Sequence, residues 1–437
     1  MARYEPGTLG PTPRDPAEAF WDPELQTLDR ERLRQLQDER LRQLVSRVFD
    51  GSAPLFRRKL EEAGVTGAGD IAGVDDLARI PLTVKQDLRD AEAEHPPFGD
   101  YRFTSPSECV RLGTSTGTTG TPTIALWTRH DIWVEYESAA RNWWRNGFRP
   151  GNVVTHAHPA YLYGGGVMMS GCLEYFGMLN LWVAPPDTDE LAEQGIRMWQ
   201  RVHPDVSMVA FSLGRFTEVA AKLGLDLAAD AGLPSFKFQG GGGRALPLFT
   251  AGLECYAYSG GPCSHSPGAH LHEDWAVIQA VDPRTGKEVP DGEWGDLVVT
   301  TLDRDNGLLR YDLEEACYLD RRPCTCGETT IRGFWGGRFK DLLASQGKHF
   351  QVGEVEGALR SVEAVTSPTL EYVVVKPRDE AAPLAVRVEL VDGDQAEVGA
   401  RCAAAIKRDL GLDAAVEVVA RDTLPRSGYK AVHLVES

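Results

Sequence analysis

The strongest local signal in the chain is the stretch TSTGTTGTPT at residues 114–123, where hydroxyl side chains alternate with glycines between two strand-like runs. Glycines let the backbone approach a ligand closely and turn its N–H groups toward an anion, and Ser and Thr hydroxyls add donors without bulk. The stretch lacks the Gly-Lys-Ser/Thr of a Walker A loop, and no strong helix signal follows it. It therefore predicts a phosphate-binding loop of another kind, with a flexible polar hairpin as the alternative.

Around this loop, short β-rich runs alternate with helical stretches, a pattern typical of α/β layers. The predicted strands are 153–155, 179–183, 206–211 and 297–301, and a helix is predicted over 188–202. Closer to the N-terminus, apolar residues recur at three- and four-residue steps from Arg30 to Glu62, which predicts one amphipathic helix. The fold class expected for residues 19–340 is therefore layered α/β.

The last hundred residues have a different pattern. Residues 371–376, 384–390 and 415–419 are predicted strands, and residues 395–410 a helix that Gly411 ends. A glycine-rich segment with Gly333, Gly336 and Gly337 precedes Arg338 and Asp341, as at a hinge between domains. We therefore expect a flexible N-terminus (1–18), a large α/β domain (19–340) and a small α+β domain (341–437).

Charge and composition exclude several classes of protein. The chain has 437 residues, with 46 Lys and Arg against 64 Asp and Glu, and the net charge of −18 disfavours nucleic acid as a partner. No apolar run is long enough to span a bilayer. Residues 1–16 are polar and lack the apolar core of a secretory signal, so we expect a cytoplasmic protein without membrane association.

Cysteines and histidines form a second constellation. Eight cysteines are too few for a disulfide scaffold in so long a chain. Cys324 and Cys326 flank one residue next to a glycine, and a distant cysteine and histidine complete the ligand types of a tetrahedral zinc site. The candidates upstream are Cys263, His265, His270 and His272. The sequence predicts a structural zinc site, with reduced cysteines and surface histidines as the alternative.

Several ordered motifs together resemble the adenylate-forming superfamily, and phenylacetate-CoA ligases in particular, over almost the whole chain. They are the phosphate-type loop and the segments 20–22 (FWD), 81–89 (PLTVKQDLR), 300–302 (TTL), 309–311 (LRY), 337–338 (GR) and 424–427 (LPRS), with Asp341 and Lys430. The resemblance implies a large N-terminal α/β domain, a small C-terminal lid, an active site between them and often a homodimer.

The activity that the resemblance implies has two steps. A carboxylate, here expected to be aromatic, attacks the α-phosphate of ATP to give an acyl-AMP and pyrophosphate, with Mg²⁺ on the nucleotide. A thiol, expected to be that of coenzyme A, then takes the acyl group. Lys430 would stabilise the charge that develops at the α-phosphate, unless it is a solvated surface lysine. The β- and γ-phosphates would be held by Ser115, Thr116, Gly117, Thr118, Thr119 and Gly120.

Other roles are assigned by the same resemblance. Arg338 would contact the ribose or a phosphate and Asp341 would be the hinge, unless both are solvated loop charges. Glu315 would bind the ribose hydroxyls, with Asp312 as the competing candidate. Residues near the nucleotide would be Gly242, Gly243, Arg244, Tyr256 and Ser259, and the substrate pocket would be lined by His158, Tyr161, Tyr163, Gly164 and Gly165, although aromatic residues at this spacing are often ordinary core. The zinc ligands would be Cys263, His270, Cys324 and Cys326, with His265 also in reach.

Two positions depart from the family pattern. Gly260 stands where relatives have a glutamate that helps bind magnesium, and Thr121 stands where many have lysine. Adenylation with a different partner is therefore an alternative: the acyl group would go to an amine or a carrier protein, or nitrite would be the activated oxyacid, as in ATP-dependent aryl diazotases. A nucleotide-binding protein without catalysis is a further alternative, which the retention of Lys430 disfavours.

Overall fold

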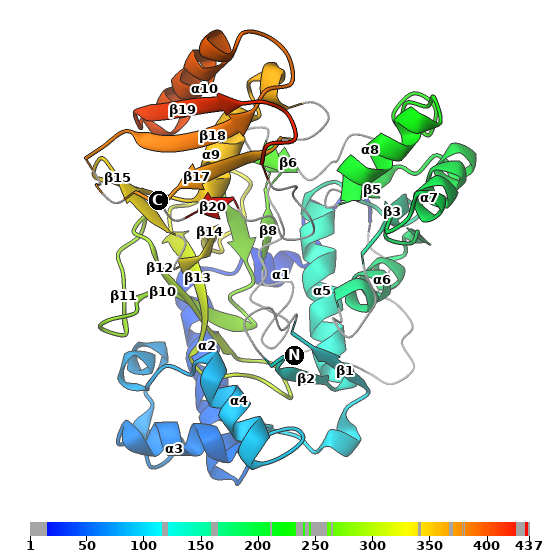
Figure 1. The fold of residues 1–437 in the computed structure, drawn as a ribbon. Coiled ribbons are helices and arrows are strands. Elements are labelled where there is room, and N and C mark those ends of the chain that lie inside the picture. Colours follow the sequence, from blue (N-terminus) through cyan, green and yellow to red (C-terminus); the bar gives the residue numbers. More distant parts are fainter. Residues whose placement is uncertain are drawn as a thin grey trace. The chain divides into compact units, whose positions relative to one another are not determined.

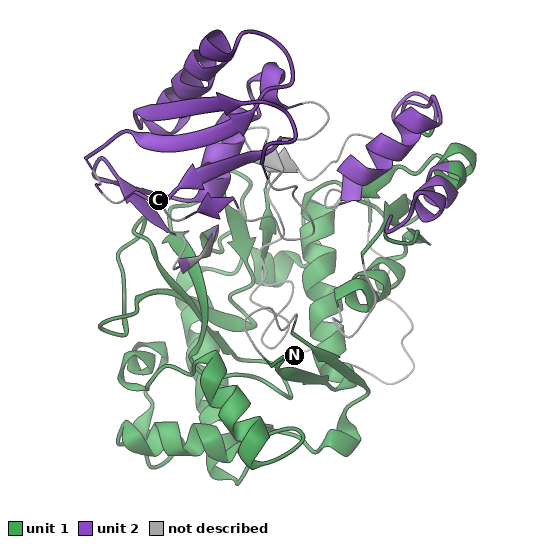
Figure 2. Cartoon of the chain, viewed as in Figure 1, with its two compact units in different colours: residues 1–185, 197–209, 231–335 green, residues 186–196, 210–230, 336–437 purple. Residues whose placement is uncertain are grey.

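The computed structural model describes residues 15–115, 121–158, 165–209, 212–232, 260–263, 265–339, 342–366, 370–377, 379, 381–424 and 433–435, and the backbone of 239–240 and 244–245. The chain divides into two compact units (Figure 2). The first comprises residues 1–185, 197–209 and 231–335, and the second comprises 186–196, 210–230 and 336–437. The domain boundary expected at residue 341 stays a prediction.

The first unit begins with helices. They are α1 (Pro23–Gln26), α2 (Arg30–Phe49), α3 (Pro54–Glu62) and α4 (Lys85–Glu94), with short 3₁₀ turns at Ala68–Asp70 and Val74–Arg79. The single helix predicted over residues 30–62 was wrong, because the chain turns between α2 and α3. Gly51 has a φ of +105° and Ala53 one of +51°, and Pro54 starts α3 at the position where a missing N–H costs nothing.

A large sheet packs against these helices. Among the described residues it has the strand order β11-β10-β12-β13-β14-β9-β8, with antiparallel pairing from β11 to β13 and from β14 to β8 (Figure 1). The strands are β8 (Gly260–Pro262), β9 (Ala269–Leu271), β10 (Ala276–Asp282), β11 (Lys287–Glu288), β12 (Gly295–Thr301), β13 (Tyr311–Asp320) and β14 (Arg332–Arg338). One apolar core joins this sheet to α2, α3 and α4, through residues such as Leu41, Phe56, Ile278 and Leu309.

A second, parallel sheet has the order β4-β3-β5, with β3 (Val153–His156) between β4 (Leu179–Trp182) and β5 (Val206–Met208). Helices α6 (Gly165–Phe176) and α7 (Asp189–Val202) connect its strands, as parallel pairing requires. An aromatic core that includes Trp21, Trp143, Trp144 and Phe176 lies between α5 (Arg129–Arg145) and α6. Both sheets confirm the predicted α/β class.

In the second unit, β19-β18-β17-β20 form a four-stranded sheet among the described residues. The elements of this unit are β15 (Leu343–Ser345), β16 (Lys348–Phe350), α9 (Val352–Leu359), β17 (Tyr372–Val375), β18 (Leu384–Glu389), α10 (Gln395–Leu410), β19 (Ala414–Val419) and β20 (Leu434–Val435), with α8 (Leu213–Lys222) earlier in the chain. The prediction that Gly411 ends a helix over 395–410 is confirmed, because Gly411 caps α10 with a left-handed φ of +70°. No helix in the described part of the chain has the length and apolar character that crossing a membrane requires.

Candidate functional site

The phosphate-type loop lies at the end of a hairpin made by β1 (Arg111–Thr114) and β2 (Ile124–Trp127). Ser115 and Thr123 close its base. The Ser115 N–H donates to the Thr123 carbonyl at 3.0 Å, and the Thr123 N–H donates to Ser115 Oγ at 3.0 Å. Because the Ser115 side chain is buried in these contacts, it holds the loop ends together. The phosphate-binding candidates Thr116, Gly117, Thr118, Thr119 and Gly120 lie outside the described residues.

Two of the family-like segments meet beside this loop. Arg89 on α4 donates from Nε to the Thr121 carbonyl at 3.0 Å, at the loop's outgoing end. In the same segment, the Thr83 N–H donates to the Arg310 carbonyl at 2.8 Å, and the Asp312 N–H donates back to the Thr83 carbonyl at 2.8 Å. The segment at residues 81–89 therefore connects the loop with the start of β13, where the ribose candidates lie.

The two ribose candidates, Glu315 and Asp312, have different surroundings. Glu315 is half-buried and accepts a hydrogen bond at 2.8 Å from Nε1 of Trp335, which is 47% exposed. Asp312 is buried, and its Oδ1 accepts the Glu314 N–H at 2.8 Å. Burial raises the pKa of Asp312, which disfavours the charged form that would accept from two hydroxyls. These surroundings favour Glu315, and its role stays a prediction.

Asp296 lies next to these carboxylates on β12. It is 5% exposed, and Oδ1 has no hydrogen-bond partner among the described residues. Burial, followed by repulsion from Asp312 and then Glu314, raises the pKa of Asp296 to about 7. Asp296 could not be identified from the sequence, because a lone acid in a strand has no signature that marks it as functional. The side chain is therefore poised to change its protonation near neutral pH.

Two histidines end the central parallel strand β3. His156 is buried, its ring lies 5.1 Å from that of Trp182, and Trp182 Nε1 donates to the His158 carbonyl at 2.9 Å. Burial, then the neighbouring His158, lowers the pKa of His156 to about 3, so its ring is neutral. The carboxyl end of a parallel strand is a common ligand position, and the substrate pocket that includes His158 stays a prediction. Gly165 starts α6, whereas Tyr161, Tyr163 and Gly164 lie outside the described residues.

The cysteine and histidine candidates come together from three parts of the chain. Ligand atoms of Cys263, His270, Cys324 and Cys326 all lie within 4.8 Å of one another. Cys263 follows β8, His270 is on β9, and Cys324 and Cys326 lie in the turn between β13 and β14. His270 Nε2 lies 3.4 Å from the Cys326 sulfur, and the sulfurs of Cys263 and Cys324 are 3.8 Å apart. Three sulfurs and one imidazole nitrogen fit a closed tetrahedral zinc site, which stays a prediction.

The other two histidines of this region are placed differently. His265 lies beside Cys263, with Nδ1 3.8 Å from the sulfur, but it is outside the group of four. His272 is buried against Ser138 on α5. Burial lowers the pKa of His270, but hydrogen bonding to Cys263 and the nearby Glu328 carboxylate raise it more, and the net direction is upward. Because His270 belongs to the group of four and His265 does not, the geometry favours His270 over His265 as the fourth ligand.

Gly260, which the resemblance places at the family's magnesium-binding glutamate, lies in β8 with no room for a side chain. A Cβ built on it would lie 2.6 Å from the His270 carbonyl oxygen on the paired strand β9. A glutamate could therefore not replace this glycine without a shift of β9.

The remaining predicted residues are not tested by the described side chains. Lys430, Asp341, Gly242, Gly243, Tyr256 and Ser259 lie outside the described residues, and Arg244 and Arg338 are described only as backbone in β7 (Arg244–Ala245) and β14.

Comparison with known proteins identifies relatives over most of the chain. Phenylacetate-coenzyme A ligase of Thermus thermophilus is 34% identical over 372 residues, covering 81% of each chain. The enzymes of that name from Pseudomonas putida and Escherichia coli are 27% and 28% identical and cover 97% and 94% of this chain. A crystal structure of 2-hydroxyisobutyryl-CoA ligase with 2-HIB-AMP, in the postadenylation state, has a TM-score of 0.79 and 24% identity, and covers 99% of this chain and 95% of its own. No family model matches the chain.

Proposed function

The chain belongs to the phenylacetate-CoA ligase family, and from that premise we propose that it is an AMP-forming ligase that activates an aromatic carboxylic acid with ATP and transfers the acyl group to coenzyme A. The observation that carries the proposal is the 34% identity over 81% of both chains. The hydrogen bonds that join the family-like segments around residues 83, 89, 121 and 310 support it, because they hold together the elements that the activity needs.

In the first step, a carboxylate oxygen of the acid attacks the α-phosphorus of ATP. The bond between the α-phosphorus and the bridging oxygen breaks, and pyrophosphate leaves. The loop at residues 115–120 would hold the departing phosphates, Lys430 would stabilise charge at the α-phosphate, and Glu315 would accept the ribose hydroxyls. In the second step, the coenzyme A thiol loses its proton and attacks the acyl carbonyl, and AMP leaves. Magnesium would neutralise phosphate charge, held by a carboxylate other than one at position 260.

Gly260 favours a second candidate function. The resemblance places Gly260 where the family has its magnesium-binding glutamate, and the backbone of β9 fills the space that a side chain at Gly260 would need. A changed metal site is compatible with adenylation for another acceptor, an amine or a carrier protein, or with activation of nitrite for aryl diazotisation.

The experiment is ATP/pyrophosphate exchange with magnesium, across benzoic, phenylacetic, cinnamic and amino-substituted aryl acids, with further wells that contain nitrite and an arylamine. Exchange that needs only an acid supports carboxylate adenylation. Mass analysis after addition of coenzyme A or an amine then distinguishes a thioester from an amide. AMP release that needs nitrite would replace acid–coenzyme A ligation by activation of nitrite for aryl diazotisation. Absence of turnover in every well, despite measurable ATP binding, would overturn both and favour a nucleotide-binding protein without catalysis.

A further inference from the structure

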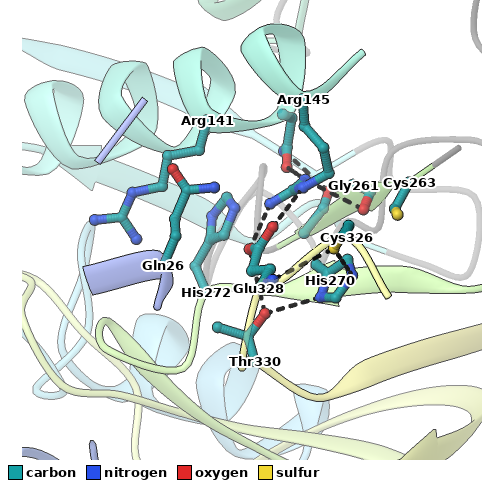
Figure 3. A network of polar contacts seen from close by, with 12 residues as sticks. Gln26, Arg141, Arg145, Gly261, Cys263, His270, His272, Cys326, Glu328 and Thr330 are labelled. Carbon is teal, nitrogen blue, oxygen red and sulfur yellow. Dashed lines mark hydrogen bonds and ion pairs between the residues drawn. The ribbon is translucent and has the colours of Figure 1, made fainter. Parts of the chain in front are cut away.

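A chain of buried polar contacts leads away from the predicted zinc ligands (Figure 3). His270 Nδ1, on the far side of the ring from the sulfurs, lies 3.1 Å from Thr330 Oγ1. The Thr330 hydroxyl donates to Glu328 Oε1 at 3.2 Å. Both Glu328 oxygens accept from Arg145, with Nε and Nη2 each at 2.7 Å. The side chains of Arg145 and Glu328 are only 6% and 0% exposed, so water does not compete for these contacts.

The order of donors fixes the position of the imidazole proton. Glu328 is held by a bidentate guanidinium, and a carboxylate in this arrangement only accepts. Thr330 must therefore use its single proton toward Glu328, and its oxygen accepts from His270 Nδ1–H. In a neutral ring with the proton on Nδ1, the lone pair is on Nε2. That is the nitrogen 3.4 Å from the Cys326 sulfur, on the side where a metal would bind.

Arg145 also connects the two halves of the ligand cluster to one helix. It is the last residue of α5, and its Nη1 donates to the Gly261 carbonyl at 3.3 Å, two residues before Cys263. Glu328 follows Cys326 by two residues, and its N–H donates to the Cys326 sulfur at 3.4 Å. One guanidinium therefore contacts both segments that supply cysteines, as Figure 3 shows.

We propose that Thr330, Glu328 and Arg145 are positioning residues of a zinc centre. They hold His270 in the tautomer that presents Nε2 to the metal, and they couple the ligand segments to the C-terminal end of α5. The proposal rests on the zinc assignment for Cys263, His270, Cys324 and Cys326. It does not depend on which acid or acceptor the enzyme uses, because metal binding is measured without substrate.

The test measures zinc content per chain and zinc affinity by competition with a chromogenic chelator, and records the absorption of the cobalt-substituted protein. Thr330→Val keeps the shape of the side chain and removes the hydroxyl, whereas Thr330→Ser keeps the hydroxyl. We expect Thr330→Val to weaken zinc binding about 10- to 100-fold, the usual cost of losing an outer partner of a metal-bound histidine, and to alter the cobalt spectrum. Thr330→Ser should restore both toward the parent.

Glu328→Gln is matched to a control on α5, the helix that carries its partner Arg145. Glu135 on α5 makes a similarly buried ion pair with Arg304, with side chains 0% and 2% exposed, but it contacts none of the four ligands in the described hydrogen bonds. We expect Glu328→Gln to weaken zinc binding and Glu135→Gln to lower thermal stability while zinc affinity is unchanged. If Glu328→Gln does not fold, the Thr330 pair decides.

Three results would overturn the proposal. One is a parent protein that binds no zinc, and a second is a Thr330→Val variant with parental zinc affinity and cobalt spectrum. The third is equal weakening of zinc binding by Glu135→Gln and Glu328→Gln, which would assign the effect to the general stability of α5. Since ATP/pyrophosphate exchange is a separate assay, failure of the proposed enzymatic function would leave each of these results interpretable.

Discussion

Glu315, the predicted ribose ligand, accepts a hydrogen bond from the indole of Trp335. The resemblance marks Glu315 by its distance from Arg310 and Tyr311, but the indole N–H that Glu315 accepts belongs to Trp335, twenty residues later. Trp335 is the last residue of its segment in the first unit, and nearly half of its surface is exposed. Since a glutamate side chain has one more rotatable bond than an aspartate, we infer that Trp335 restricts the position of the carboxylate.

Trp335→Phe removes the indole donor while an aromatic ring stays in place. A hydrogen bond to a charged group contributes roughly 1 to 2 kcal/mol, so we expect the KM for ATP to rise about 5- to 30-fold with little change in the KM for the acid. Steady-state kinetics with each substrate varied in turn measures both. Glu315→Gln should have a larger effect on the same constant. An unchanged KM for ATP, or equal rises in both constants, would contradict a role of Trp335 at the ribose.

The raised pKa of Asp296 predicts how the stability of the protein changes with pH. This pKa is about 7 in the folded protein, above the ordinary value near 4, so the folded state binds the proton more tightly than the unfolded state does. Stability should therefore fall as the pH rises from about 4 to about 7. Asp296→Asn removes this penalty. We expect the variant to unfold at a higher temperature than the parent at pH 8 and at nearly the same temperature at pH 4, by calorimetry. A gain that is equal at both pH values would contradict ionisation as the cause.

At the scale of elements, the pairing of β8 with β9 explains the departure at position 260. Gly260 pairs with Leu271, and an added Cβ would meet the His270 carbonyl at 2.6 Å and Leu271 Cδ2 at 2.7 Å. His270 is also the predicted zinc ligand on β9. The glycine therefore permits the close approach of the two strands that carry the predicted zinc ligands Cys263 and His270, and this packing gives a steric reason why no side chain occupies position 260.

Gly260→Ala tests this explanation. Forcing a methyl group into a closely packed strand pair typically costs about 1 to 3 kcal/mol, so we expect a lower free energy of unfolding in urea and weaker zinc binding. Gly69→Ala in the same unit is the control, because nothing lies within 4 Å of the added Cβ there. If Gly260→Ala unfolds like the control and binds zinc like the parent, the backbone of β9 does not restrict this position.

Local patterns in the sequence predict elements well when one segment contains the whole signal. The strands near 153, 179, 206 and 297 and the helix at residues 395–410 follow from spacing, and a glycine with a left-handed φ ends that helix as predicted. The prediction of one helix over 30–62 was wrong because the apolar spacing continues across the turn at Gly51, after which Pro54 starts a new helix. Periodicity reports which face is buried but not whether the axis is continuous.

In the molecule as a whole, local sequence patterns could not predict which residues distant in the chain contact one another. Arg145 and Glu328 are 183 positions apart, and Glu315 meets Trp335 only because β13 and β14 lie in one sheet. Cys324 and Cys326 could be predicted as metal ligands from the sequence, because cysteines are chemically distinctive and these two are close in sequence. Positioning residues such as Thr330 have no such signature. The only available signal for Glu328 and Thr330 was their place directly after the cysteine pair.

The prediction for Lys430 can be tested because it separates nucleotide binding from the chemical step. The loop at residues 115–120 belongs to the first unit, and Lys430 belongs to the second. The role that the resemblance implies for Lys430 lies in the chemical step and not in nucleotide binding. Lys430→Ala should then leave the Kd for ATP nearly unchanged and lower the rate of adenylate formation by about 100-fold or more, the usual loss when one stabilising donor of a transition state is removed.

Single-turnover formation of the adenylate, together with ATP binding by calorimetry, separates these two quantities. Lys407→Ala is a matched control, since Lys407 lies in the same unit on α10 and makes an exposed ion pair with Asp413 at 2.9 Å. Such pairs contribute little, so both quantities should stay at the parental values in the control. Weaker ATP binding with an unchanged rate of adenylate formation at saturating ATP would place the lysine among the nucleotide-binding groups, because the loss of an interaction made equally in the ground state and the transition state lowers affinity without slowing the chemical step. Equal losses of binding and rate would also contradict the role assigned to Lys430.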